Sequence, residues 1–244
     1  LFLSLAAMVA MFAPDAWLAS RWTPLSLALT HLLTLGYLGT TMVGALLQML
    51  PVVIGSPVPA AGPIGWAALL GICGGTLLLA AGFLLGNPTL LMLAALALAA
   101  GLVPFLLGTL VSLVRARALP HVAWPMRQAW LALAVTFILG LALASGLAGL
   151  WATPDLMGLT GLHAAWGLGG WVLILVVGVA YQVVPMLQIT PAYSKGIITA
   201  LTWAMPVSLM VFTAGWFLPA PPARGVEALA LLVGMTSAVA FALA

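Results

Sequence analysis

Long runs of apolar residues constrain this chain more than any other feature. Runs of about 20 residues can cross a hydrocarbon core of roughly 30 Å as a helix. Eight such stretches occur, at residues 1–18, 25–52, 64–86, 89–113, 128–151, 161–187, 197–218 and 225–244. They lack the alternation at every second residue that membrane β-strands show. The sequence therefore predicts an all-α, polytopic membrane bundle of about eight transmembrane helices.

Charged residues are too few for a protein that folds in water. Only 4% of the residues are charged and 65% are hydrophobic, and this composition cannot cover the surface of a soluble globule. The six basic residues are scattered, which argues against nucleic acid as a partner. The one cysteine, Cys73, lies inside the third run. It excludes both a disulfide framework and a Cys-x-x-Cys-His attachment of heme, and we expect it to be a small buried side chain.

The positions of the basic residues predict the orientation of the chain. Four of them follow the fourth or the sixth run, and two lie on the opposite side: Arg115, Arg117, Arg127 and Lys195 against Arg21 and Arg224. This excess places both termini in the cytoplasm, and we expect the membrane to be a bacterial inner membrane. The sequence has no initiator methionine and stops within an apolar run. We therefore expect it to be part of a longer protein.

One sequence pattern occurs twice. Its two copies begin at His31 and His163, and the chain holds only three histidines. Aligning the copies pairs Gly36 with Gly170, Tyr37 with Trp171, Gly44 with Gly178, Gln48 with Gln182 and Pro51 with Pro185. Pro-Asp pairs at 14–15 and 154–155 also match. The pattern predicts two tandem four-helix repeats, residues 1–118 and 119–244, related by an axis along the membrane normal because four crossings return the chain to its starting side.

The two repeated histidines are the candidate functional residues. An imidazole in or near hydrocarbon is costly unless its ring nitrogens are satisfied, and neutral imidazole is a common ligand of heme iron. At 3.6 residues per turn, His31 shares a face with two leucines and Met42, which would line a porphyrin edge. His163 shares its face with Gly167 and Gly170, and glycines there would leave room for a flat macrocycle.

Simpler interpretations of these residues stay open. Each repeated histidine could be an interfacial side chain bonded to a loop carbonyl or to water. The third, His121, stands among arginines and is expected in a solvated loop. Gly36, with Thr40 and Gly44, has the spacing of ordinary helix packing as well as that of a cofactor groove.

The segment from His31 through Gly36-Tyr37 and Gly44 to Pro51-Val-Val-Ile-Gly55 resembles the second helix of heme–copper oxidase subunit I. The resemblance extends to the cbb3-type and nitric oxide reductase branch and to the NnrS membrane heme proteins. In short cbb3-like chains the motif is similar to His-x-His-x4-Gly-Trp. His31 takes its second histidine position and His163 its first, while Leu29 and Ala165 occupy the vacant positions.

The resemblance implies non-covalent binding of b-type heme from the outer side of the membrane. The expected iron ligands are His31 and His163, and the expected cofactor-binding residues are His31, His163, Gly36, Met42, Gly167 and Gly170. Whether the two histidines hold one iron or each serves a separate heme stays open at this point. The roles that follow are electron transfer, binding of a diatomic gas such as NO or O2, or heme handling.

The sequence also departs from this family. It has no His-Pro-Glu-x-Tyr-like copper site and no paired histidines in a seventh helix, so no complete oxidase active site is encoded. Heme A synthase does not fit either, because the fourth and eighth runs contain no histidine. The alternatives are a cofactor-free transporter or channel-like protein and a structural subunit of a respiratory membrane complex. Beyond the lipid bilayer, the expected partners are respiratory or oxidase-assembly subunits, or a second copy of the chain.

Overall fold

The computed structural model describes residues 1–12, 20–116, 120–153, 155–189, 191–218 and 222–242, and all of their regular structure is helical. Among these described residues, six continuous helices are long and apolar enough to span a membrane: Pro24–Ile54, Ala61–Leu85, Pro88–Val114, Val122–Leu147, Leu156–Gln188 and Lys195–Trp216. Two shorter apolar helices lie at residues 2–11 and 228–241. The prediction of a helical membrane bundle is therefore confirmed.

Two of these spans change helix type along their length. The first consists of α3 (Pro24–His31), a π-helix η1 (Leu32–Gly39) and α4 (Thr40–Ile54). The second consists of α8 (Leu156–Ala164), a π-helix η2 (Ala165–Ile174) and α9 (Leu175–Gln188). The remaining helices are α1 (Phe2–Phe12), α5 (Ala61–Leu85), α6 (Pro88–Val114), α7 (Pro120–Leu147), α10 (Lys195–Trp216) and α11 (Pro222–Ala242).

The contacts divide the chain into two compact units. Unit 1 consists of Leu1–Val52, Ser56–Val114 and Leu141–Thr153, and unit 2 of Val53–Gly55, Arg115–Gly140 and Pro154–Ala244. The end of α7 thus belongs to unit 1. The repeat boundary between residues 118 and 119 stays a prediction.

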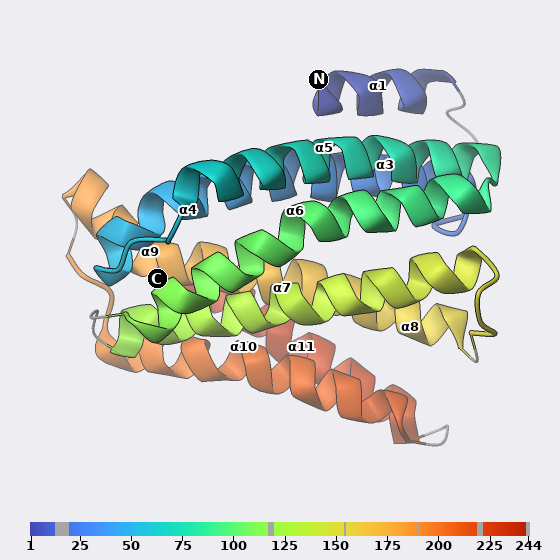
Figure 1. Ribbon diagram of the computed structural model, residues 1–244. Coiled ribbons are helices and arrows are strands. Elements are labelled where there is room, and N and C mark those ends of the chain that lie inside the picture. Colours follow the sequence, from blue (N-terminus) through green and yellow to red (C-terminus); the bar gives the residue numbers. More distant parts are fainter. Residues whose placement is uncertain (13–19, 117–119, 154, 190, 219–221, 243–244) are drawn as a thin grey trace. The chain divides into compact units, whose positions relative to one another are not determined.

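Within unit 1, α5 and α6 form a hairpin of closely packed helices (Figure 1). A Cβ placed on Gly71 would lie 2.6 Å from the Ala97 carbonyl oxygen, and one on Gly75 would lie 2.6 Å from Leu98 Cγ. Small residues therefore let the two backbones approach, as expected for helices that pack without a hydrophobic driving force in lipid. At the turn Gly86 has φ +58, a conformation that glycine adopts without steric cost.

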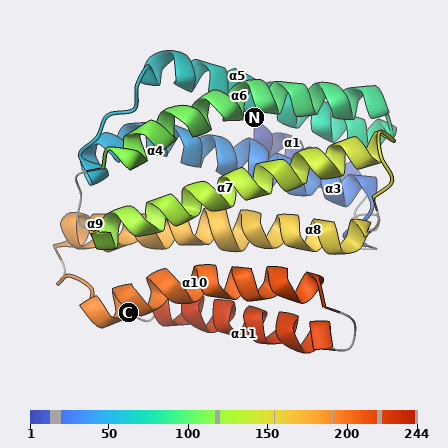
Figure 2. The same cartoon turned by 60° about the horizontal axis from the view of Figure 1, so that its bottom comes forward.

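Within unit 2, α7 packs against the span formed by α8, η2 and α9. A Cβ on Gly178 would lie 2.5 Å from Pro125 Cβ, and one on Gly170 would lie 2.7 Å from Ala132 Cβ. The later residue of the span faces the earlier residue of α7, so the two helices are antiparallel. Beside them α10 and α11 form a second hairpin (Figure 2).

The predicted start of the fifth span is wrong. The sequence predicts an apolar run that begins at residue 128, with His121 in a solvated loop before it. In the structure α7 already begins at Pro120, so the backbone of His121 and Arg127 is helical. Proline suits the first turn of a helix because the amide proton that it lacks would have no partner there. An arginine near a span end keeps its charge at the interface while its stem covers apolar surface.

Candidate functional site

Each repeated histidine stands just before a π-helical segment. η1 begins one residue after His31 and is 8 residues long. η2 begins two residues after His163 and is 10 residues long. Long π segments are rare in proteins, and π-bulges are frequent at functional sites. Gly36 and Gly170, which the sequence alignment pairs, both fall inside these segments.

The two histidines also stand at the same place relative to the start of their spans. Thr23 is the N-cap of α3, where its hydroxyl accepts a hydrogen bond from the Ser26 amide at 3.1 Å. Asp155 is the N-cap of α8, where its carboxylate accepts one from the Gly158 amide at 2.9 Å. Each cap precedes its histidine by eight residues. As N-caps, Thr23 and Asp155 therefore take equivalent places. The matching of Pro-Asp pairs stays a prediction, because Asp15 lies outside the described residues.

Asp155 also joins two helix ends of unit 2. Its second carboxylate oxygen accepts a hydrogen bond from the Trp216 indole at 3.0 Å, at the end of α10. The amide of Gly158 and the indole of Trp216 both stabilise the charged carboxylate, and they hold its pKa below the ordinary value of 3.8. The carboxylate is exposed, so this cap lies at an open end of the helices.

The His31 imidazole is half-buried and is held by its own helix. Its Nδ1 lies 2.8 Å from the Leu27 carbonyl oxygen, and its ring is tilted by 43° against that of Phe83 in α5, with centroids 5.3 Å apart. A carbonyl oxygen only accepts hydrogen bonds, so Nδ1 must carry the proton. In the neutral imidazole Nε2 then bears the lone pair.

The His163 imidazole is half-buried and is held by a neighbouring helix. Its Nδ1 lies 3.0 Å from the Thr136 carbonyl oxygen in α7, and the same argument assigns the proton to Nδ1. Gly140, one turn along α7, makes room for the ring, since a Cβ there would lie 3.1 Å from His163 Cε1. Thr136 and Gly140 were missed in the sequence, because a backbone carbonyl and one more glycine leave no recognisable signal.

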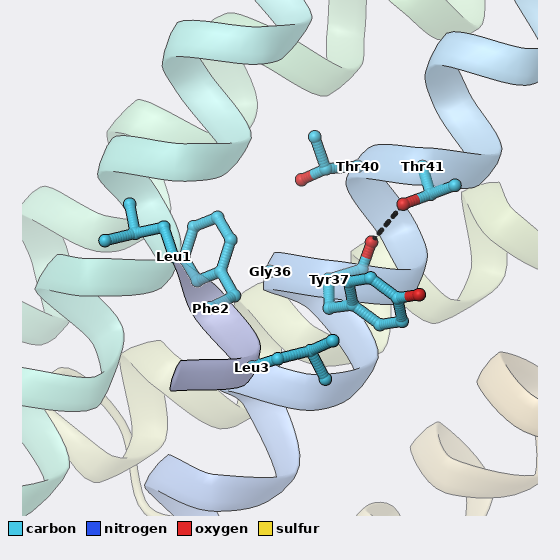
Figure 3. Close-up of a pocket in the computed structure, with 7 residues that line it drawn as sticks. All are labelled: Leu1, Phe2, Leu3, Gly36, Tyr37, Thr40 and Thr41. Atoms are coloured by element: carbon cyan, nitrogen blue, oxygen red, sulfur yellow. Dashed lines mark hydrogen bonds between the residues drawn. The ribbon is translucent and has the colours of Figure 1, made fainter. Parts of the chain in front are cut away.

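The predicted cofactor residue Gly36 is covered by a side chain of unit 1. A Cβ on Gly36 would lie 2.5 Å from Phe2 Cδ1, because α1 packs on η1 at this point. Beside the contact is an open hollow of about 220 Å³, lined by Leu1, Phe2, Leu3, Gly36, Tyr37, Thr40 and Thr41 (Figure 3). Among the described residues the buried Thr40 hydroxyl has no hydrogen-bond partner.

The predicted cofactor residues of the second repeat are packed as well. A Cβ on Gly167 would lie 3.2 Å from Thr136 Cγ2, and one on Gly170 would also approach Leu209 Cδ1, at 3.2 Å. These glycines therefore allow close contact with α7 and α10. Met42 is half-buried in α4, eleven residues or roughly 16 Å along the helix axis from His31.

These residues fit heme in their donor chemistry but not in the space around them. The donor chemistry fits, because iron-ligating histidines donate their second ring N–H to a carbonyl or carboxylate, and His31 and His163 both do so. The space does not fit, since the hollow at Gly36 is smaller than the roughly 300–1,000 Å³ of ordinary ligand pockets and His31 does not line it. In the described part of the chain, no group of three or more His, Cys, Asp or Glu could hold a bare metal ion.

Comparisons with known protein families, with curated proteins and with solved structures found no match for this chain. Its function must therefore be argued from these histidines and the helices that carry them.

Proposed function

We propose that this chain is an integral membrane protein that binds b-type heme non-covalently through His31 and His163, and that it is related to heme–copper oxidase subunit I and the NnrS proteins. The observation that carries the proposal is that both imidazoles donate Nδ1–H to a backbone carbonyl. They do so at equivalent positions, just before a π segment.

In this proposal the protein orients the two imidazole rings toward the iron. The carbonyls of Leu27 and Thr136 fix the tautomer of each ring and increase the basicity of Nε2. Heme, when bound, supplies one-electron chemistry or a site for a diatomic gas. The roles that follow are electron transfer, binding of NO or O2, or heme handling.

The proposed location is a bacterial inner membrane with both termini in the cytoplasm, as the distribution of Lys and Arg indicates. The outer ends of the spans then include the N-caps Thr23 and Asp155. Both histidines lie near that outer side, where the resemblance places the heme. Respiratory or oxidase-assembly subunits and a second copy of the chain are the proposed partners.

A second candidate is a structural subunit without cofactor. The tight contacts over Gly36 and Gly170 favour it, because packed glycines serve helix association directly. A transporter or channel-like protein is the other cofactor-free alternative, with the histidines relaying protons.

Absorption spectra of the full chain distinguish these candidates. We expect the protein, purified in mild detergent and supplied with hemin, to show a Soret band and a pyridine hemochrome of b-type heme. His31→Ala and His163→Ala should each remove part or all of the band, whereas His121→Ala should leave it unchanged. Far-UV circular dichroism verifies that each variant is folded. A folded wild-type protein that stays colourless with hemin rejects the proposal and favours the structural subunit.

A further inference from the structure

Two buried hydroxyl groups of unit 2 have no hydrogen-bond partner among the described residues. Tyr181 in α9 is 6% exposed and Thr202 in α10 is 7% exposed, and neither side-chain oxygen forms a hydrogen bond in that part of the chain. Buried hydroxyls in proteins nearly always have a partner, because leaving a buried polar group unbonded is costly. The two oxygens therefore need a partner that the side chains and backbone around them do not supply.

The hydroxyl of Thr202 differs from other threonine hydroxyls in the spans. Thr213, in the same helix, donates a hydrogen bond to the carbonyl oxygen of Leu209 at 2.8 Å. Thr136 in α7 donates in the same way to the carbonyl oxygen of Ala132 at 2.7 Å. A bond to the carbonyl four residues earlier is how a threonine satisfies its hydroxyl within a helix. Thr202 makes no such bond among the described residues, so its hydroxyl is directed elsewhere.

The hydroxyls of Tyr181 and Thr202 lie close to each other, between α9 and α10. Tyr181 stands seven residues before Gln188, the last residue of α9, and Thr202 stands seven residues after Lys195, the first residue of α10. Each therefore lies about 10 Å along its helix from the ends that residues 189–194 connect (Figure 2). Although the two hydroxyls are neighbours at the same level, they are not in the geometry of a direct hydrogen bond.

Two further aromatic rings pack on Tyr181 and hold it in place. Its ring lies 5.6 Å from that of Tyr193, in the segment before α10, and 6.1 Å from that of Phe241 in α11, both edge to face. The rings of Tyr193 and Phe241 stack on each other at 6.0 Å. Ring pairs at such distances attract each other. The Tyr181 ring would lose both contacts if it turned to bring its hydroxyl out of the bundle.

A water molecule meets the requirements of this place. Each hydroxyl can donate one hydrogen bond and accept others, so a single water between them satisfies both. Buried waters in proteins bond in this way to polar groups that are otherwise unsatisfied. Ordered waters have the same role inside membrane helix bundles. Both groups are hydroxyls, which suits a neutral ligand.

We propose that the hydroxyls of Tyr181 and Thr202 form a binding site for one ordered water molecule, which connects α9 to α10 next to the rings of Tyr193 and Phe241. The water accepts from one hydroxyl and donates to the other. The site is independent of heme, because it uses neither of the repeated histidines.

Nuclear Overhauser cross-peaks between water and the protein test the proposal. The chain has three tyrosines, so labelled tyrosine in a deuterated full chain gives few signals, and Tyr181→Phe assigns the one of interest. We expect a cross-peak from water to the ring edge of Tyr181 in the wild type. Thr202→Val, which replaces the hydroxyl by a methyl group of similar size, should weaken it by about fivefold, the loss of occupancy expected from one hydrogen bond. Thr202→Ser, which keeps a hydroxyl, should retain it.

Thr199→Val is the matched control, since Thr199 is an exposed threonine of the same helix, and we expect it to leave the cross-peak unchanged. A wild type without the cross-peak overturns the proposal. An unchanged cross-peak in Thr202→Val does so too, because exchange of the Tyr181 hydroxyl proton with solvent then explains the signal. If Thr202→Val does not fold, labelled threonine methyl groups in the wild type decide, since a water between the residues requires a cross-peak to the Thr202 methyl group as well.

Stability provides a second measurement. Tyr181→Phe and Thr202→Val should each lower the melting temperature in detergent by roughly 2–4 °C, because each leaves the water with one partner fewer. The double variant should lose less than the sum of the two, since it removes both partners of the water together. A rise in both single variants overturns the proposal, because it would show that the hydroxyls are unbonded in the folded protein.

Discussion

The spans that carry His31 and His163 have the same order of helical segments, but their imidazoles bond to different helices. Each has a capped start, a histidine eight residues later and a long π segment. In unit 1 the imidazole bonds to its own helix, at Leu27. In unit 2 it bonds to α7, at Thr136. The matching backbones with different side-chain contacts indicate that backbone geometry, more than any one neighbour, places the imidazoles.

The paired glycines show the same contrast. Gly36 meets the ring of Phe2, a side chain near the start of the short helix α1. Gly170 meets Ala132 Cβ, which is attached directly to the backbone of α7 and cannot rotate away. The contact at Gly170 is therefore the more rigid of the two.

The largest expected effect tests this difference in rigidity. We expect Gly170→Ala to lower the free energy of unfolding by about 1–3 kcal/mol, the usual cost of overpacking, because the new methyl group would meet Ala132. Gly36→Ala should cost less, since the Phe2 ring can turn. Thermal unfolding in detergent measures both. Gly44→Ala is the control, with nothing within 4 Å of its Cβ, and equal losses in all three variants would contradict the comparison.

The two N-caps provide the next test. Asp155→Ala and Thr23→Ala should each cost about 1 kcal/mol, and they should differ in pH dependence. The pKa of Asp155 is lowered in the folded protein, so its charge stabilises the fold above the ordinary pKa of 3.8, and this contribution is lost as the pH falls through the lowered value. Between pH 7 and pH 3, the melting temperatures of wild type and Asp155→Ala should approach each other only below the ordinary pKa of 3.8. The gap between wild type and Thr23→Ala should stay constant over that range, and a gap that closes there as well would refute the assignment.

The smallest expected effect concerns the ring of His163. Gly140→Ala should change stability by less than about 1 kcal/mol, because the gain in helix propensity offsets a slightly tight contact. It should nevertheless press on the ring and alter the spectrum of heme bound at His163. The measurement is made in a His31→Ala background, and Gly161→Ala, where a Cβ meets nothing within 4 Å, is the control. An identical spectrum in Gly140→Ala and its parent would argue against ligation by His163.

Hydropathy alone was sufficient to predict most of the spans. Lengths near 20 residues and the scarcity of charge leave few options for such a chain. The start of α7 was missed because Arg127 resembles a loop residue, although a long side chain can keep its charge at the interface from inside a helix. The start of α3 at Pro24 was placed within one residue.

The candidate sites were only partly predictable. The repeated sequence pattern identified both histidines. The π segments were not predicted, because the assignment of shared helix faces assumed 3.6 residues per turn throughout. A π-helix bonds each residue to the fifth along rather than the fourth, so the face shared by His31 and Met42 is not maintained through η1. The glycines inside both segments were the available signal, since glycine disfavours an ordinary helix interior. Heme binding itself stays a prediction.

The shared interval between cap and histidine has a consequence for engineering. Eight residues of helix correspond to about 12 Å, so the capping residue fixes how far along its span each imidazole lies from the capped end. One residue inserted between Asp155 and Leu162 would lower the ring by about 1.5 Å and swing it by about 100° around the axis. The capped start of each span thus determines the position of its imidazole along the helix.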